Sequence, residues 1–218
     1  MKKRKPLTRA LILEKAMKLL DDEGLEGLSM RRLASALKVE AMSLYHHVTD
    51  KQDLLSALAD LALSTIPPPD LTKPWRQRAE GIAVGLYQAL LAHPALVGVL
   101  AAETAQPRDA RVLLGLDQLI GALAEAGLSP TQQVSAQRSM IAFCFGFVLT
   151  HTRGLVETRE QAQETWDQYD PNQFPAEHFP HLAALGVEFV RTKAEDDFRF
   201  LVQAWLDAVE RAGASRPG

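Results

Sequence analysis

Cysteine is almost absent from this sequence, in which Cys144 stands alone. A single cysteine excludes an intramolecular disulfide framework and fits a reducing compartment. No apolar run approaches the roughly 20 residues that a membrane-spanning helix needs. The basic start MKKRKPLTR does not resemble a secretory signal, because the apolar residues 11–13 lead directly into Glu14 and Lys15. The sequence therefore predicts a cytoplasmic protein without a membrane partner.

The signatures of several enzyme classes are also missing. There is no glycine-rich phosphate loop and no HExxH, GxSxG or CxxC motif. His178 and His181 are spaced like metal ligands, but Pro180 lies between them and no cysteine is near, so we expect no metal. Cys144 lies within FCFGF, where burial would make the thiol unreactive. We predict no enzymatic activity and no cofactor.

Charge is distributed unevenly along the chain. The net charge is −3, yet residues 1–51 carry eleven Lys/Arg and seven Asp/Glu, whereas the remainder is strongly acidic. A positive N-terminal region on a negative body favours a polyanion that meets that region alone. A solvated basic tail is equally compatible with the charge pattern.

Apolar residues recur at helical spacing along most of the chain, and neither strand-like alternation nor an internal repeat is found. The sequence therefore predicts an all-α fold. Four helices are expected in the N-terminal region. They run from the cap Thr8 to about Glu23, with Gly24 as a left-handed stop, then over 30–37 after the cap Ser29, over 40–47, and from the cap Asp50 to Ile66.

The proline-rich segment IPPPDLTKP, residues 66–74, interrupts the helices and predicts a domain boundary. Residues 1–66 would form the N-terminal head, and residues 67–218 a larger helical body. Further helices are expected over 75–92, 95–104, 108–126, 130–155, 181–192 and 195–212. The polar stretch 157–180 is expected to be a long loop.

The second and third helices are joined by a tight turn at Lys38–Val39, which is typical of a helix-turn-helix. Val39, Leu44 and Val48 are expected to face the core, which leaves small, aromatic and polar side chains outside, suited to a DNA major groove. Lys51, at the start of the fourth helix, would add its charge to the helix dipole at a phosphate. The candidate DNA-binding residues are Arg31, Ala41, Met42, Ser43, Tyr45, His46, His47 and Lys51, with the tail Lys2–Arg9 along an adjacent groove. Taken singly, Tyr45 is equally compatible with a half-buried core position.

Residues 10–55, ALILEKAMKLLDDEGLEGLSMRRLASALKVEAMSLYHHVTDKQDLL, resemble the DNA-binding head of the tetracycline-repressor (TetR) family. The resemblance extends more loosely to about residue 212. It implies a homodimer that binds a pseudo-palindromic DNA operator and is released by a small-molecule effector. The family's usual glycine in the turn is Lys38 here, which the turn accommodates if its φ is negative. Ala41 and Met42 differ from the base-reading residues of the tetracycline repressors, so the resemblance does not predict the operator sequence.

The resemblance also implies dimerisation through the helices near 130–155 and 195–212. Their apolar stripes would form a four-helix interface or, alternatively, intramolecular core. A ligand pocket is expected among the helices of the body, with Leu86, Tyr87, Leu90, Phe143, Phe147 and His151 as candidates. For each of these residues plain packing is the alternative. Pro67 and Leu100 stand where tetracycline-binding members hold a magnesium–drug chelate with histidines, so that effector is not predicted.

These observations together predict a ligand-responsive, DNA-binding transcriptional repressor. A helical small-molecule-binding protein or enzyme with an incidental basic head is the alternative hypothesis. An activator with the same head is also compatible with the sequence.

Overall fold

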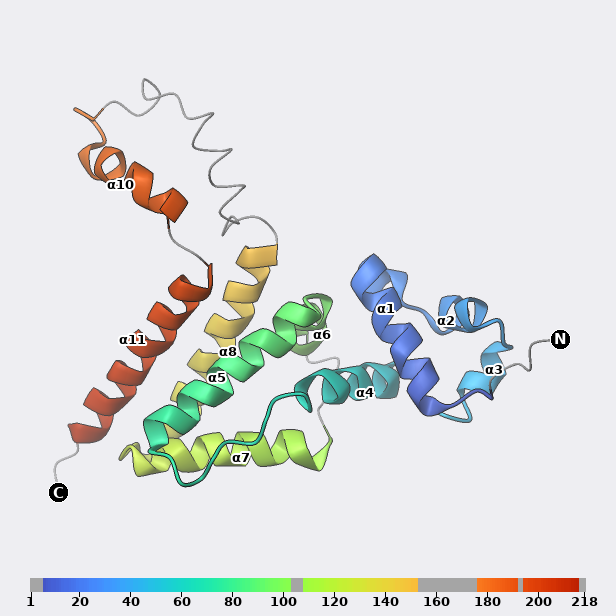
Figure 1. Cartoon of the computed structure of the whole chain (residues 1–218). Coiled ribbons are helices and arrows are strands. Elements are labelled where there is room, and N and C mark those ends of the chain that lie inside the picture. Colours follow the sequence, from blue (N-terminus) through green and yellow to red (C-terminus); the bar gives the residue numbers. More distant parts are fainter. Residues whose placement is uncertain (1–5, 103–107, 153–175, 192–193, 216–218) are drawn as a thin grey trace.

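The computed structural model describes residues 6–102, 108–152, 176–191 and 194–215, and every regular element in these ranges is a helix (Figure 1). The all-α prediction is confirmed. The helices are α1 (Arg9–Gly27), α2 (Met30–Leu37), α3 (Ala41–Leu44), α4 (Lys51–Leu63), α5 (Trp75–Ala92), α6 (Ala95–Ala101), α7 (Ala110–Glu125), α8 (Pro130–Thr152), α10 (Pro180–Arg191) and α11 (Ala194–Ala214). Most of the predicted stretch 157–180 lies outside the described residues.

The helices of the head begin where side chains can satisfy their free N–H groups. Thr8 Oγ1 accepts from the Leu11 nitrogen and Ser29 Oγ from the Arg32 nitrogen, each at 3.2 Å. Asp50 Oδ1 accepts from the Asp53 nitrogen at 2.7 Å. These three predicted caps are confirmed, and they set the starts of α1, α2 and α4.

Two residues of the head adopt a positive φ. Gly24 has φ 71° and ψ −175°, so it kinks α1, which resumes up to Gly27, and does not form the left-handed stop that we expected. Lys38 has φ 57° and ψ 44°, so the condition of a negative φ, under which the turn would accommodate a lysine, is not met. The reason is the end of α2, where the N–H groups of Lys38 and Val39 donate to the carbonyls of Ser35 and Ala34, both at 3.0 Å. This paired closure of a helix end requires a left-handed residue, whichever side chain it carries.

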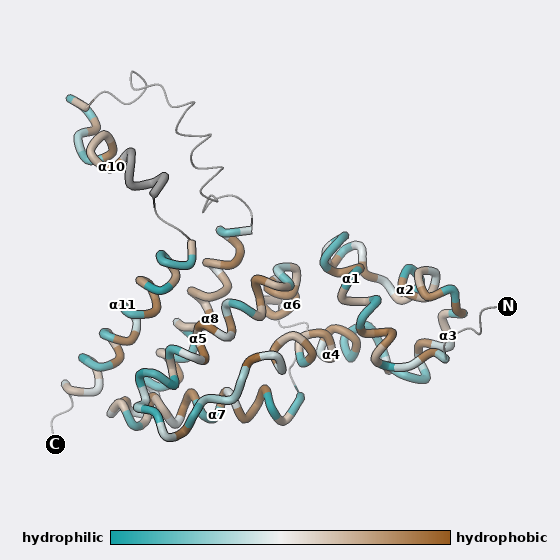
Figure 2. Tube along the Cα trace, in the orientation of Figure 1, coloured by the Kyte–Doolittle hydropathy of each residue, from teal (hydrophilic) through white to brown (hydrophobic). Residues whose placement is uncertain are grey.

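The body is arranged around α5, which packs against α4, α7, α8 and α11 (Figure 1). The α5–α6 corner is bent by 116°. Figure 2 shows teal and brown alternating along α11, as expected of a helix with one face on the core and one in solvent. In Figure 1, α10 lies beyond the start of α11, apart from the other helices of the body.

α4 connects the head to the body. One continuous group of buried apolar residues begins in α1, passes through Leu54, Leu58 and Ala62 of α4, and continues through α5 and α8 to α11. Polar contacts also join the two parts, including a hydrogen bond of 2.9 Å between His93 Nδ1, after α5, and Asp21 Oδ2 of α1. The head therefore rests on the body through packing as well as through the chain. The domain boundary after residue 66 stays a prediction.

Candidate nucleic-acid interface and ligand cavity

The third helix presents a mixed polar and aromatic surface to solvent. Leu44 is fully buried and Val48 nearly so, which confirms that these two residues anchor the helix to the core. Met42 is 71% exposed and Tyr45 43% exposed, and His46 is exposed as well. The helix itself is shorter than predicted, since Tyr45 to His47 form a turn. The surface that we expected to face DNA is therefore accessible.

The remaining candidates flank this surface, and all but Arg31 lie in less open positions. Arg31 is exposed on α2, whereas Ala41, Ser43 and His47 are half-buried. Lys51 is also half-buried, and its Nζ donates to the Leu25 carbonyl oxygen at 3.4 Å. An ammonium group has three N–H donors, so this bond leaves two for a phosphate.

Arg9 has a role that sequence reasoning missed. Its guanidinium donates to the carbonyl oxygen of His47 and lies 3.8 Å from the Asp53 carboxylate. It thereby fastens the start of α1 to the turn after α3 and to the start of α4. Residues 2–5 of the basic tail lie outside the described residues. Arg9 is the only basic residue of the predicted tail whose place is defined, and it serves the head's own structure.

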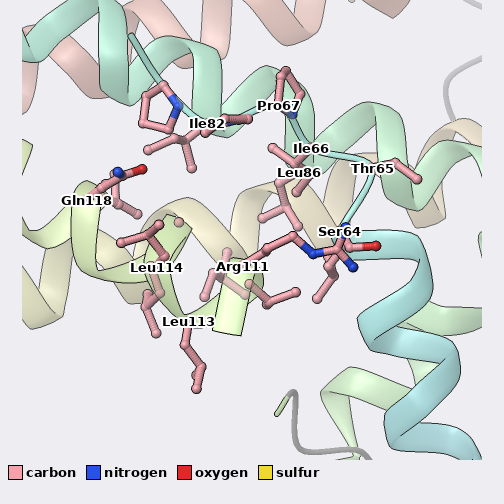
Figure 3. A pocket seen from close by; sticks show the side chains of 18 of the residues that line it. Ser64, Thr65, Ile66, Pro67, Ile82, Leu86, Arg111, Leu113, Leu114 and Gln118 are labelled. Atoms are coloured by element: carbon pink, nitrogen blue, oxygen red, sulfur yellow. The ribbon is translucent and has the colours of Figure 1, made fainter. Parts of the chain in front are cut away.

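A cavity of about 680 Å³ lies in the body, between the segment that follows α4 and the helices α5, α7 and α8 (Figure 3). This volume is within the range of sites for drug-sized ligands. Most of its lining is apolar. The lining residues are 63–69, Ile82, Leu86, Leu100, 111–116, Gln118, Leu119, Gln137, Met140, Ile141 and Phe145.

Of the six predicted ligand-binding residues, only Leu86 lines this cavity. Helical phase explains the difference, because residues two apart on α8 point to different sides. Ile141 and Phe145 line the cavity, whereas Phe143 and Phe147 turn toward α11. Leu90 is fully buried in the core. A ligand-binding role for these residues stays a prediction.

Tyr87 lies at the centre of an aromatic cluster between α5, α8 and α11. Its ring stacks on Phe198 with centroids 4.0 Å apart, and Phe147 meets both rings edge-on. The Tyr87 hydroxyl lies 2.8 Å from His151 Nδ1. Burial, followed by the nearby charge of Glu195, raises the pKa of Tyr87 above its ordinary value. The cluster accounts for four of the predicted ligand-binding residues as partners of one another or of α11.

The polar lining of the cavity was missed from the sequence. Arg111 is the only charged residue among those described in the lining, with Gln118 and Gln137 as longer polar groups. Arg111 Nε and Nη2 donate to the Asp109 carboxylate at 3.1 and 3.2 Å, and these bonds lower the pKa of Asp109. Gln118 Oε1 is buried without a hydrogen-bond partner among the described residues. For Arg111 and Gln118 the available signal was their position as polar residues in the largely apolar sequence of α7, whereas Gln137 lies on α8.

The apolar stripes of α8 and α11 pack within one chain. Met140, Cys144, Phe198 and Val202 are all buried, and Trp205 Nε1 donates to Ser139 Oγ at 3.1 Å. The alternative of intramolecular core therefore holds for these stripes. Other faces of both helices remain open, with Phe200 77% exposed and with exposed small residues. These are Ala142 and Gly146 on α8, and Ala204 and Ala208 on α11.

Two observations on the described residues concern metal binding and catalysis. They contain no group of three or more His, Cys, Asp or Glu side chains that could hold a metal ion. Cys144 is buried, and this burial raises the pKa of its thiol to about 12, as expected for an unreactive position. In the same part of the chain no single helix is long and apolar enough to cross a membrane, although α5 and α6 satisfy that test as a bent pair.

An outward-facing helix-turn-helix joined to a helical body that holds a ligand-sized cavity defines a ligand-sensing DNA-binding regulator. Two family models match the chain in agreement with this. The model of the bacterial regulatory proteins of the tetR family matches residues 12–58, and that of the tetracyclin repressor-like C-terminal domain matches residues 68–211. The chain belongs to the TetR family. It is a ligand-responsive, DNA-binding transcriptional repressor, of a family whose regulators are generally not enzymes.

Relatives and solved structures agree with this assignment. The tetracycline repressor of class C from Escherichia coli is 31% identical over 162 residues, which make up 72% of each chain. ActR from Streptomyces coelicolor in complex with actinorhodin has a TM-score of 0.76 and 27% identity, over 94% of this chain and 96% of that one. BioQ with its natural double-stranded DNA operator has a TM-score of 0.62 and 26% identity, over 94% of this chain and 99% of that one. Structures of this fold thus include a complex with a small molecule and one with DNA.

Proposed function

We propose that the exposed surface of α3 reads the operator and that the cavity of about 680 Å³ holds the effector. The observation that carries the first part is the contrast within α3, where buried Leu44 fixes the helix and exposed Met42 and Tyr45 face outward. Side chains held by a rigid anchor can meet base edges and phosphates in a fixed register. Arg31 and Lys51 would add phosphate or base contacts at the edges of this surface.

The proposed molecule is a homodimer with one head for each half of a pseudo-palindrome. The open faces of α8 and α11, which contain Gly146 and Phe200, are suited to a two-fold interface. A side-chain carbon built on Gly146 meets nothing within 4 Å among the described residues, so a partner helix can approach there. The heads would then occupy grooves about one helical turn or more apart.

We also propose that the protein is cytoplasmic, has no enzymatic activity and divides into domains after residue 66.

The DNA-reading role is tested by selecting duplexes from a random pool with the full-length protein. The enriched sequence should be a pseudo-palindrome, and retardation of that duplex in a mobility-shift assay should weaken as salt rises. Met42→Ala should change the preferred bases or reduce affinity, whereas Tyr45→Phe should weaken binding without changing the preferred sequence. Failure to enrich any sequence would refute the proposal, and an altered preference for Tyr45→Phe would assign that residue to base reading.

The ligand role of the cavity is tested with 1-anilinonaphthalene-8-sulfonate, a fluorescent dye with an apolar ring system. Leu86→Trp places a larger side chain in the cavity and should reduce dye fluorescence. Leu61→Trp is the matched control, because Leu61 is exposed on α4 and does not line the cavity. Equal loss in both variants would show that the dye binds elsewhere.

A further inference from the structure

The charge in the described lining of the cavity has one sign, because Arg111 is its only charged residue. Arg111 lies in the first turn of α7, and its side chain is 71% exposed, so it stands where the cavity opens to solvent. The same described lining contains no aspartate or glutamate. A cationic ligand would therefore leave water without gaining a countercharge, whereas an anionic ligand gains the guanidinium.

The guanidinium of Arg111 is only partly used within the chain. Its Nε and Nη2 donate to the Asp109 carboxylate, which also accepts from the Arg111 backbone nitrogen at 2.8 Å and so stays in place as the cap of α7. A guanidinium has five N–H donors, and Nη1 of Arg111 has no partner among the described residues. Arg76 demonstrates in the same chain that one guanidinium can hold two carboxylates, since its Nη2 and Nη1 contact Asp207 and Glu210. Arg111 can thus accept a second carboxylate, from a ligand.

Gln118 provides a second polar group on the same side of α7. Seven residues are close to two helical turns, so Arg111 and Gln118 lie about 10 Å apart along the helix axis. Figure 3 shows them on either side of Leu114, with apolar side chains of α5 across the cavity. Gln118 Oε1 is buried and has no hydrogen-bond partner among the described residues. A ligand that brings an N–H or O–H group to this oxygen removes the free-energy cost of leaving it unpaired.

We propose that the effector is an apolar organic acid with a hydrogen-bond donor at its far end, an inference that rests on the proposed function. The acidic group binds the Nη1 side of Arg111. The apolar body lies along Leu114 and faces Ile82 and Leu86. A hydroxyl or N–H group about 10 Å from the acid, two helical turns along α7, donates to Gln118 Oε1. Cations of the same size and shape bind more weakly.

Three naphthalene compounds test both ends of this site by isothermal titration calorimetry on the full-length protein. The first, 6-hydroxy-2-naphthoate, has a carboxylate and a hydroxyl at opposite ends of the ring system. The second, 2-naphthol, lacks the carboxylate, and the third, 2-naphthoate, lacks the hydroxyl. In the wild-type protein the carboxylate should raise affinity about ten-fold and the hydroxyl about five-fold, as expected of hydrogen bonds to a charged and to an uncharged group.

Two variants assign these gains to the two ends. Arg111→Gln should remove the gain from the carboxylate and keep that from the hydroxyl, and Gln118→Leu should do the reverse. The retained gain in each variant shows that the cavity still binds the ring system. Arg32→Gln is the matched control for the first, because Arg32 is likewise exposed and paired with a carboxylate, that of Glu23, but lies on α2 in the head. Gln77→Leu is the control for the second, since Gln77 is exposed on α5 and does not line the cavity. Both controls should keep both gains.

The outcomes separate this inference from the proposed function. The acidic class is wrong if the carboxylate brings no gain in wild type, if Arg111→Gln keeps that gain, or if the cation naphthalen-2-ylmethylammonium binds as tightly as 2-naphthoate. The donor at the far end is wrong if the hydroxyl brings no gain in wild type or if Gln118→Leu keeps it. The ligand role of the cavity itself is judged by the dye, and it fails only if Leu86→Trp and Leu61→Trp lose fluorescence equally.

Discussion

The head and the body differ in how consistently side chains cap the starts of their helices. In the head, the side chains of Thr8, Ser29 and Asp50 cap α1, α2 and α4. In the body, α5 and α6 follow Pro74 and Pro94 and have no side-chain cap, whereas the side chains of Asp109 and Ser129 cap α7 and α8. Local caps thus mark every described helix start in the head except that of α3, whereas the body combines capped starts with starts that depend on packing. The surface of the head can therefore be changed without altering its fold. In the body, by contrast, α8 packs on the core and also lines the cavity.

The largest effect should come from removing the anchor of the DNA-reading helix. Leu44→Ala leaves a cavity in the fully buried core of the head and should lower the free energy of unfolding by about 2–5 kcal/mol. Met42→Ala, two residues away and exposed, should change it by less than about 0.5 kcal/mol while reducing DNA binding. Urea unfolding and mobility shift measure the two effects. Equal destabilisation by both changes would contradict the division of α3 into anchor and surface.

A smaller effect is expected where two backbones meet in the body. A Cβ atom at Gly213 of α11 would lie 1.8 Å from the Ala126 carbonyl oxygen, so Gly213→Ala should destabilise the protein by about 1–3 kcal/mol. Gly121→Ala is the matched control on α7, because a Cβ there meets nothing within 4 Å in the part of the chain that the structure describes. That change should stabilise the protein by up to about 1 kcal/mol through better helix propensity. Thermal unfolding of both variants compares them, and a stabilised Gly213→Ala would show that the contact is loose.

Lys51 tests the electrostatic part of the head. Lys51→Ala should reduce the slope of log affinity against log salt by about one unit, because one phosphate contact is lost. Arg199→Ala, an exposed cation on α11, is the control and should leave the slope unchanged. The slope is measured by titrating the selected duplex at several salt concentrations. An unchanged slope for Lys51→Ala would assign the ammonium only to its bond with Leu25.

The smallest effect concerns the turn between α2 and α3. Lys38→Gly should stabilise the protein by up to about 1 kcal/mol, because a left-handed conformation is unfavourable for a residue with a Cβ atom. The gain is partly offset by the greater freedom of glycine in the unfolded chain. Lys38→Ala keeps the Cβ atom and should bring no gain, as thermal unfolding would show. Equal stability of the two variants would mean that the positive φ carries no strain.

The sequence predicted the head more closely than the cavity, for physical reasons. Caps, short apolar stripes and the tight turn are local features, so Ser29, Leu44 and Asp50 could be assigned without knowing the tertiary structure. The cavity depends on which side of α8 meets α7 and which meets α11, and Phe145 and Phe147 differ there by two residues only. The φ of Lys38 could have been expected from the helix end itself. By contrast, Asp60 of α4 accepts from the N–H groups of Arg108 and Asp109, just before α7, although 48 and 49 sequence positions separate these residues from it.

The leucines near the start of α7 bear on how such proteins diversify. Leu113, Leu114 and Leu116 line the cavity, yet each is close to half exposed. Side chains in such positions contribute little to the stability of the folded chain, so their replacement is tolerated. Chemical selectivity can therefore drift through these positions while the helix-turn-helix keeps the same DNA target, which lets one genetic control element acquire a new chemical signal.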